Sequence, residues 1–107
     1  MAKVANITAA EFDTEVAGRK GLVLVDLWGP NCAPCRALAP ILDDLAEDFG
    51  GEVAICKIDV EAEQDMMVRL GARAMPTLAL FHDGTEVDRI VGICTRSRLT
   101  AWLESHL

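Results

Sequence analysis

Two cysteines, Cys32 and Cys35, are separated only by Ala33 and Pro34, and their thiols are the side chains best placed for chemistry in this sequence. The thiolate form of cysteine attacks disulfides and binds metals. Two neighbouring thiols can also close into a disulfide and be opened again by exchange with another disulfide. The pair therefore predicts dithiol–disulfide exchange.

The segments around the pair predict a strand, a turn and a helix. Residues 22–28 are nearly all apolar and rich in β formers, which favours a strand buried on both faces. After Cys35, apolar residues recur at helical spacing as far as the glycines at 50 and 51. Cys32 would lie at the helix N-terminus, where free N–H groups and the helix dipole lower a thiol pKa, so we expect Cys32 to be the nucleophile. Cys35, one turn further in, would resolve the mixed disulfide, and Pro34 would stiffen the first turn without losing a hydrogen bond.

Three other interpretations of the pair compete with redox chemistry. The cysteines could be half of a zinc site, a permanent structural disulfide, or two small buried apolar residues. The strand–turn–helix context favours the redox interpretation. Zinc needs four ligands, and the remaining candidates lack ligand spacing. These candidates are Cys56, His82, Cys94 and His106.

The rest of the chain alternates strands and helices and predicts an α/β fold. We expect a mixed sheet of five strands flanked by about four helices, in one domain over residues 1–107. Thr8 and Glu11 have the spacing of a capping box at a helix start, and Asp83–Gly84 predicts a hairpin turn. The predicted strands span 4–7, 22–28, 53–58, 77–82 and 86–91, and the helices start at 8, span 35–49 and 61–70, and end the chain over 95–107.

Composition narrows the classes of partner and the compartment. The net charge of -7 argues against nucleic acid and anionic membranes as partners. No apolar run approaches the ~20 residues of a membrane span, and no secretory signal is recognised, so we expect a cytoplasmic protein. In such a reducing compartment a close cysteine pair is catalytic or metal-binding. No dinucleotide-binding glycine motif is found, so no cofactor is expected, and a monomer is the simplest expectation.

Several separate motifs, in order along the chain, give the sequence a resemblance to the thioredoxin family over essentially its whole length. The resemblance implies a thioredoxin fold and reduction of protein disulfides, with the dithiol restored by an external thioredoxin reductase, a flavoprotein that uses NADPH. The motifs are Val25-Asp26-Leu27-Trp28, Cys32-Ala-Pro-Cys35-Arg36, Pro40, Lys57-Ile-Asp59, Arg73, Met75-Pro76-Thr77-Leu78, Phe81-His-Asp-Gly84 and Val91-Gly92.

The resemblance also implies a groove that binds substrate. It places a cis peptide bond before Pro76, beside the cysteines, and Met75 would pair its backbone with an extended substrate. Gly92 and Ile93 would form another edge of this groove. Trp28 would shield the active-site loop. The simpler alternatives are an ordinary loop proline at position 76 and a core-filling tryptophan at position 28.

Asp26 is the one acidic residue in the predicted buried strand. A buried carboxylate is costly and tends to stay protonated. The resemblance implies that Asp26 lies beneath the cysteines and handles the proton of Cys35, with Lys57 on the neighbouring strand as its charge partner. A purely structural Asp–Lys pair is the alternative.

The sequence departs from the family at the site itself. Asn31 stands where the family usually has tryptophan, and Ala33 where it has glycine, so we expect changes in partner choice and redox potential. Asn31 is a good N-cap residue and is expected to cap the helix. Cys56 and Cys94 are additional cysteines, expected to be buried and inert, with an exposed, oxidisable Cys94 as the alternative. A binding module and an oxidase or isomerase remain as alternative functions.

Overall fold

The computed structural model describes residues 4–107 and contains a mixed five-stranded sheet in the order β1-β3-β2-β4-β5. The expected α/β fold with a five-stranded sheet is confirmed. The strands are β1 (Ala5–Asn6), β2 (Leu22–Trp28), β3 (Val53–Asp59), β4 (Thr77–His82) and β5 (Thr85–Val91). The helices are α1 (Ala9–Phe12), continued by a π-helical turn, η1 (Asp13–Ala17), then α2 (Ala33–Asp48), α3 (Asp65–Arg69) and α4 (Arg96–Glu104).

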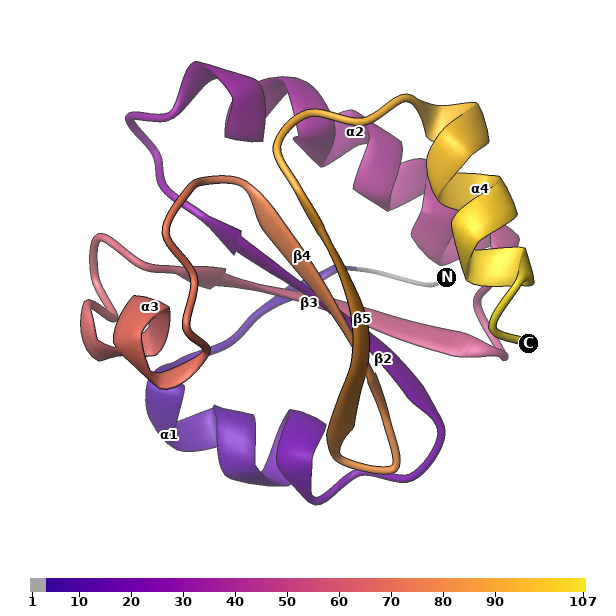
Figure 1. The fold of residues 1–107 in the computed structure, drawn as a ribbon, viewed down its shortest axis with the longest axis horizontal. Coiled ribbons are helices and arrows are strands. Elements are labelled where there is room, and N and C mark those ends of the chain that lie inside the picture. The colour runs from indigo at the N-terminus through magenta and orange to yellow at the C-terminus, as the bar shows by residue number, and fades with distance from the viewer. Residues whose placement is uncertain (1–3) are drawn as a thin grey trace.

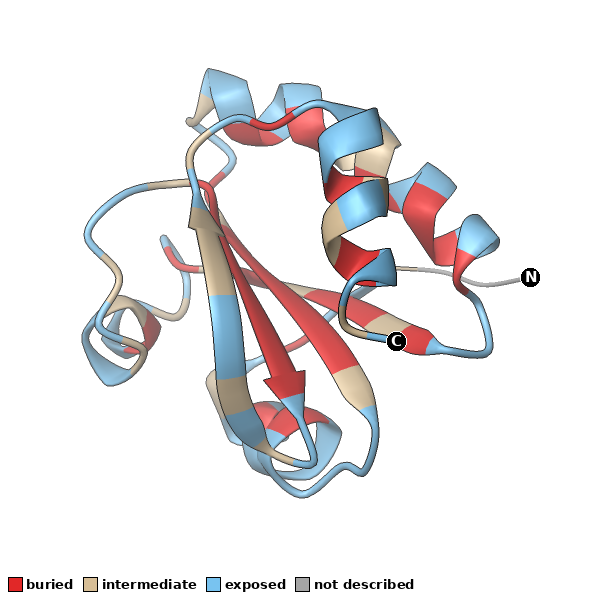
Figure 2. Ribbon diagram, turned by 45° about the vertical axis from the view of Figure 1, so that its right-hand side comes forward, coloured by how far each residue is buried: buried red, intermediate tan, exposed pale blue. Residues whose placement is uncertain are grey.

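Helices cover both faces of the sheet, with α2 and α4 on one side and α1 and α3 on the other (Figure 1). Alternating side chains of β2 enter the two cores: Leu24 packs with α2 and α4, whereas Val23 and Val25 pack on the side of α1. Accordingly β2 and β4 are buried along most of their length, while β5 is largely exposed or half-buried (Figure 2). The nearly continuous apolar run of β2 follows from this burial on both faces.

The strand directions bring the functional segments to one edge of the sheet. β2 runs parallel to β3, and β4 runs antiparallel to both β2 and β5. The C-terminal ends of β2, β3 and β5 and the start of β4 therefore lie at the same edge, the left-hand side of Figure 1. The N-terminus of α2, α3 and the loop before β4 gather there.

The local signals at turns and caps are confirmed. Thr8 and Glu11 form the predicted capping box at the start of α1. Asp83 (φ 52°) and Gly84 (φ 85°) form the two-residue turn between β4 and β5, in the left-handed conformations that such a hairpin requires. Gly84 also packs against the carbonyl of Ala17, where a side chain would collide, so it does more than form the turn.

Two predicted helices are shorter than expected. The helix predicted over 61–70 begins only at Asp65, because the Asp59 carboxylate accepts hydrogen bonds from the N–H groups of Glu61 and Ala62, at 2.9 and 3.3 Å, and holds a turn. The helix predicted over 95–107 has Thr95 as its N-cap and ends at Glu104.

Candidate active site

Cys32 and Cys35 are joined by a disulfide at the start of α2, with Cα atoms 5.3 Å apart. Cys32 is the N-cap of α2, in an extended conformation (φ -109°, ψ 105°), and Pro34 lies in the first turn. The backbone N–H of Cys35 donates to Cys32 Sγ across 3.3 Å. Cys35 is only 2% exposed, whereas Cys32 is half-buried. The predicted arrangement, an outer sulfur at the helix end and an enclosed inner one, is confirmed.

The cap position corrects the expectation for Asn31. Cys32 occupies the N-cap, and the Asn31 amide points instead to Glu61, in the turn after β3. Glu61 accepts two hydrogen bonds from Asn31, one from its backbone N–H at 3.0 Å and one from Nδ2 at 2.8 Å. Gly29 allows this approach, because a Cβ there would lie 2.5 Å from Glu61 Oε2. Sequence reasoning missed Glu61, since its only signal was the unusual asparagine beside the cysteine pair.

The loop between β2 and α2 is also held by hydrogen bonds within residues 29–36. Arg36 Nη1 donates to the Pro30 carbonyl at 2.8 Å, and the N–H of Cys32 donates to the Gly29 carbonyl at 3.1 Å. With the Glu61 contacts, these bonds fix the short loop that carries Cys32. Such bracing presents a reactive group on a rigid support.

Asp26 lies in β2 on the face covered by α2 and is 2% exposed. Its neighbour on that face, Leu24, packs with Leu38 of α2, and Leu38 lies one turn beyond the buried Cys35. Asp26 therefore faces the core beneath α2, the helix that begins at the cysteine pair. Burial raises the pKa of Asp26 from 3.8 to about 7, although the positive charge of Lys57 acts in the opposite direction. No group in residues 4–107 donates a hydrogen bond to Asp26 Oδ1.

Lys57 is paired with Asp26 in the parallel register of β2 and β3. Its Nζ lies 4.9 Å from the ring centroid of Trp28, a cation–π contact. The Trp28 indole also donates from Nε1 to Asn6 Oδ1 at 3.4 Å. Within the described residues, Lys57 forms no direct ion pair with Asp26. Its positive charge lowers the pKa of Asp26 from a distance. Trp28 links the site to β1, and its shielding of the active-site loop remains a prediction.

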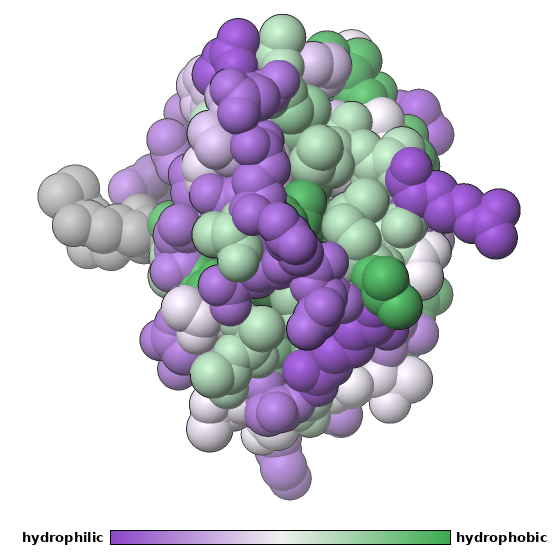
Figure 3. Space-filling view, turned by 90° about the vertical axis from the view of Figure 1, so that its left-hand side faces the viewer, coloured by the Kyte–Doolittle hydropathy of each residue, from purple (hydrophilic) through white to green (hydrophobic). Residues whose placement is uncertain are grey.

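The loop before β4 contains the expected cis bond between Met75 and Pro76. The Pro76 carbonyl accepts a hydrogen bond from the N–H of Gly92 at 2.9 Å, which joins this loop to the end of β5. Gly92 has a φ of 89°, and the following Ile93 is 64% exposed. The structure therefore brings the pair Met75–Pro76 next to the pair Gly92–Ile93, although the two pairs are well separated in sequence. The side of the molecule with α3 and this loop shows apolar surface interspersed with hydrophilic side chains (Figure 3).

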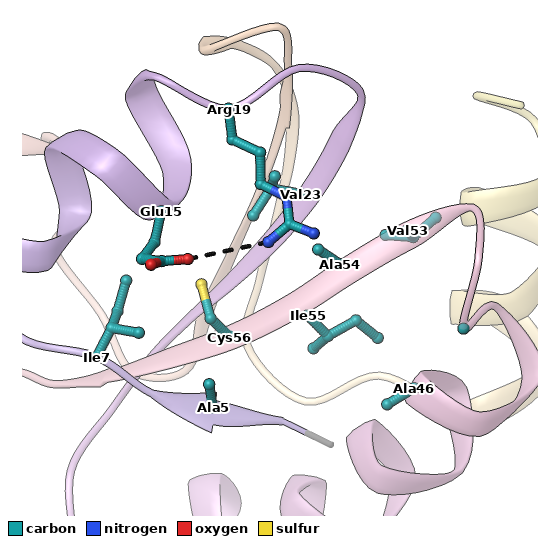
Figure 4. Close-up of a pocket in the computed structure, with 11 residues that line it drawn as sticks. Ala5, Ile7, Glu15, Arg19, Val23, Ala46, Val53, Ala54, Ile55 and Cys56 are labelled. Carbon is teal, nitrogen blue, oxygen red and sulfur yellow. Dashed lines mark ion pairs between the residues drawn. The ribbon is translucent and has the colours of Figure 1, made fainter. Parts of the chain in front are cut away.

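The two additional cysteines are free and buried, as expected. Cys94 belongs to the core between the sheet and α2 and α4. Cys56 borders a cavity of about 230 Å³ formed by β1, η1 and the first half of β3. Its sulfur points toward the ion pair between Glu15 and Arg19, 3.9 Å apart (Figure 4). Burial raises the Cys56 pKa to about 12, so its thiol stays protonated near neutral pH.

The arrangement carries no sign of a metal centre or membrane span in the described part of the chain. Among residues 4–107, no three His, Cys, Asp or Glu side chains gather closely enough to hold a metal ion. In the same residues, no helix has the length and apolarity needed to cross a bilayer.

Comparison with known proteins agrees with the fold and the cysteine pair. The family model described as thioredoxin matches residues 3–105. Thioredoxin of Pseudomonas aeruginosa is 38% identical, with 97% of this chain and 96% of that protein covered. Thioredoxin 1 of Nostoc sp. is 36% identical over the full length of both chains, and thioredoxin C-2 of Corynebacterium nephridii is 38% identical over 99% of this chain and 98% of its own. With its disulfide-bonded cysteines at the start of α2, this chain belongs to the thioredoxin family and is a thiol–disulfide oxidoreductase.

Proposed function

We propose that this chain is a reductase of protein disulfides in which Cys32 attacks and Cys35 resolves. The observation that carries the proposal is the position of Cys32 at the N-cap of α2, with the Cys35 N–H directed at its sulfur. The same N–H and the helix dipole would stabilise the Cys32 thiolate after reduction. The burial of Cys35 supports its role as the second, protected thiol.

The reaction proceeds in two exchanges. The Cys32 thiolate attacks one sulfur of a substrate disulfide, forms a mixed disulfide and releases the other substrate sulfur as a thiolate. Cys35, once deprotonated, attacks Cys32 Sγ, closes the intramolecular disulfide and releases the second substrate thiolate. Two electrons pass from the dithiol to the substrate. An external dithiol donor, a flavoprotein reductase supplied by NADPH, returns the chain to its reduced form.

Asp26 is the proposed acceptor of the Cys35 proton. Its pKa of about 7 suits a group that takes and returns a proton near neutral pH. Lys57 would help the carboxylate to form, because its charge opposes the effect of burial on Asp26. Asp26 faces the core beneath α2, the helix that carries Cys35, and this placement supports the assignment.

The substrate would lie as an extended segment along the Met75–Pro76 loop and the Gly92–Ile93 edge. Backbone pairing with Met75 would align the substrate disulfide without demanding a particular sequence. The remaining proposed contacts come from the rim of the cysteine pair: Trp28, Asn31, Ala33 and Pro34. We further propose that the protein works as a monomer in the cytoplasm, and its two free thiols support a reducing compartment.

Reduction of insulin by dithiothreitol, followed as precipitation of the free B chain, tests the proposal. The wild type is expected to accelerate precipitation, and Cys32→Ser to abolish the acceleration. Cys35→Ser is expected to accumulate a mixed disulfide with substrate, because the second exchange is removed. A wild type with no effect on the rate, with fully reduced Cys32 and Cys35 at the start, would contradict the proposed function.

A further inference from the structure

A separate apolar pocket of about 370 Å³ opens between α2 and the start of α4. The α2 side is formed by Ala37, Leu38 and Ile41, and Cys94 is also part of the lining. Leu38 and Cys94 are buried core residues, so the pocket reaches down to the core. Its size is at the lower end for small-molecule sites, which suits a single large side chain.

The pocket is continuous with the proposed substrate groove through Ile93. This residue lines the pocket and is 64% exposed. Its neighbour Gly92 is hydrogen-bonded to Pro76, so the wall of the pocket adjoins the loop that contains the cis bond. A substrate segment that runs along Met75 and Gly92 would therefore reach Ile93 and then the pocket.

Arg98, in the first turn of α4, is the one charged residue in the pocket lining. The neighbouring Arg96 pairs with Asp44 and Asp48 of α2, at 3.3 and 2.9 Å. Within the described residues, Arg98 has no such acidic partner. An exposed cation at the mouth of an apolar pocket would complement an apolar side chain that has a carboxylate beside it. The protein as a whole has a net charge of -7 and repels acidic segments, so Arg98 offers them a local attraction.

We infer that this pocket is a specificity subsite for the substrate protein: it binds a large apolar side chain near the attacked cysteine, and Arg98 pairs with an acidic residue next to that side chain. The inference rests on the proposed function. Along α2, the pocket lies about 10 Å from Cys32 at 1.5 Å per residue, a distance that about three residues of extended peptide span. The apolar residue should therefore lie three positions from the substrate cysteine.

Symmetrical peptide disulfides test the subsite, because attack on either sulfur then gives the same product. One peptide carries leucine three positions and glutamate four positions before its cysteine. A second carries leucine three positions and glutamate four positions after it. In the matched control peptides serine replaces the leucine and glutamine replaces the glutamate. Reduction by the pre-reduced protein is followed in a single turnover by chromatography of the released thiol. We expect one Leu-Glu peptide to react about tenfold faster than its Ser-Gln control, because binding in the pocket removes one large apolar side chain from water.

Two variants assign the preference to the pocket. Ala37 is exposed on α2, so Ala37→Phe should fill the pocket without disturbing the core, and is expected to reduce the rate ratio to about one. Arg98→Gln should remove only the part of the rate preference that depends on glutamate. A peptide with glutamine in place of that glutamate measures this part in the wild type. Ala101→Phe, at an exposed position of α4 outside this pocket, is the matched control and should keep the preference.

Each outcome decides between the inference and its alternatives. Equal rates for Leu-Glu and Ser-Gln peptides, or a preference that survives Ala37→Phe, would overturn the subsite while leaving the reductase function intact. Failure of the wild type to reduce any peptide would refute the proposed function itself. If sedimentation shows that the wild type self-associates and Ala37→Phe does not, the pocket holds a second copy of the chain and the inference is wrong.

Discussion

Replacement of the buried Asp26 by alanine gives a stability change whose dependence on pH follows from the structure. Burial raises the pKa of this carboxyl from 3.8 to about 7 in the folded chain. Between these two values the unfolded chain has lost the proton and the folded chain still holds it. Stability of the wild type therefore falls by about 1.4 kcal/mol per pH unit across this window and levels off above pH 7.

The total penalty at pH 8 is about 4 kcal/mol, of which less than half is already present at pH 5. Asp26→Ala removes the penalty but leaves a small cavity, whose cost does not depend on pH. The gain in stability from the substitution should therefore grow by about 2 to 3 kcal/mol between pH 5 and pH 8, whatever the cavity costs. Turnover at neutral pH should fall, since the acceptor for the Cys35 proton is lost.

Urea unfolding of the oxidised wild type and variant at pH 5, 6, 7 and 8 measures this difference. Both proteins retain the disulfide, so its contribution to stability cancels. A stability difference that stays constant over these pH values would refute the argument that burial controls this carboxyl. Turnover of Asp26→Ala equal to wild type between pH 6 and 9 would remove Asp26 from the mechanism.

Three further predictions concern the supports of the site and the fold. Glu61→Ala is expected to lower the free energy of unfolding by about 1 kcal/mol. A double-mutant cycle with Asn31→Ala, measured by denaturation, should give a coupling energy of similar size, whereas additive effects would show that the two residues act independently. Gly84→Ala should cost about 2 kcal/mol or more, because of its positive φ and the collision with a neighbouring carbonyl, whereas Gly51→Ala, where a Cβ meets nothing within 4 Å, should be nearly neutral in thermal unfolding. In the reduced protein at pH 8, iodoacetamide should label Cys56 far more slowly than the N-cap thiol, as peptide mass spectrometry can measure; comparable rates would contradict the burial of this thiol.

Local sequence signals determined the central elements and the reactive pair. The bounds of β2 and β4 were predicted correctly, because strands buried in the middle of a sheet have continuous apolar runs with clear ends. The hairpin at Asp83–Gly84 and the capping box at Thr8 were also predictable, since each depends on residues within a few positions of one another. The position of Cys32 at a helix N-terminus followed from the change of period between β2 and α2.

Only the tertiary structure decided what surrounds that pair. Asn31 was expected to cap α2, but Glu61, 30 residues away, holds it elsewhere. The contact between Gly92 and Pro76 and the pocket bordered by Ile93 likewise depend on segments that meet only after the sheet has formed. Such contacts are fixed by strand order and burial, which act over long separations in sequence. The sequence by itself thus determined which residues react, whereas the packed fold decided the environment and the partners of those residues.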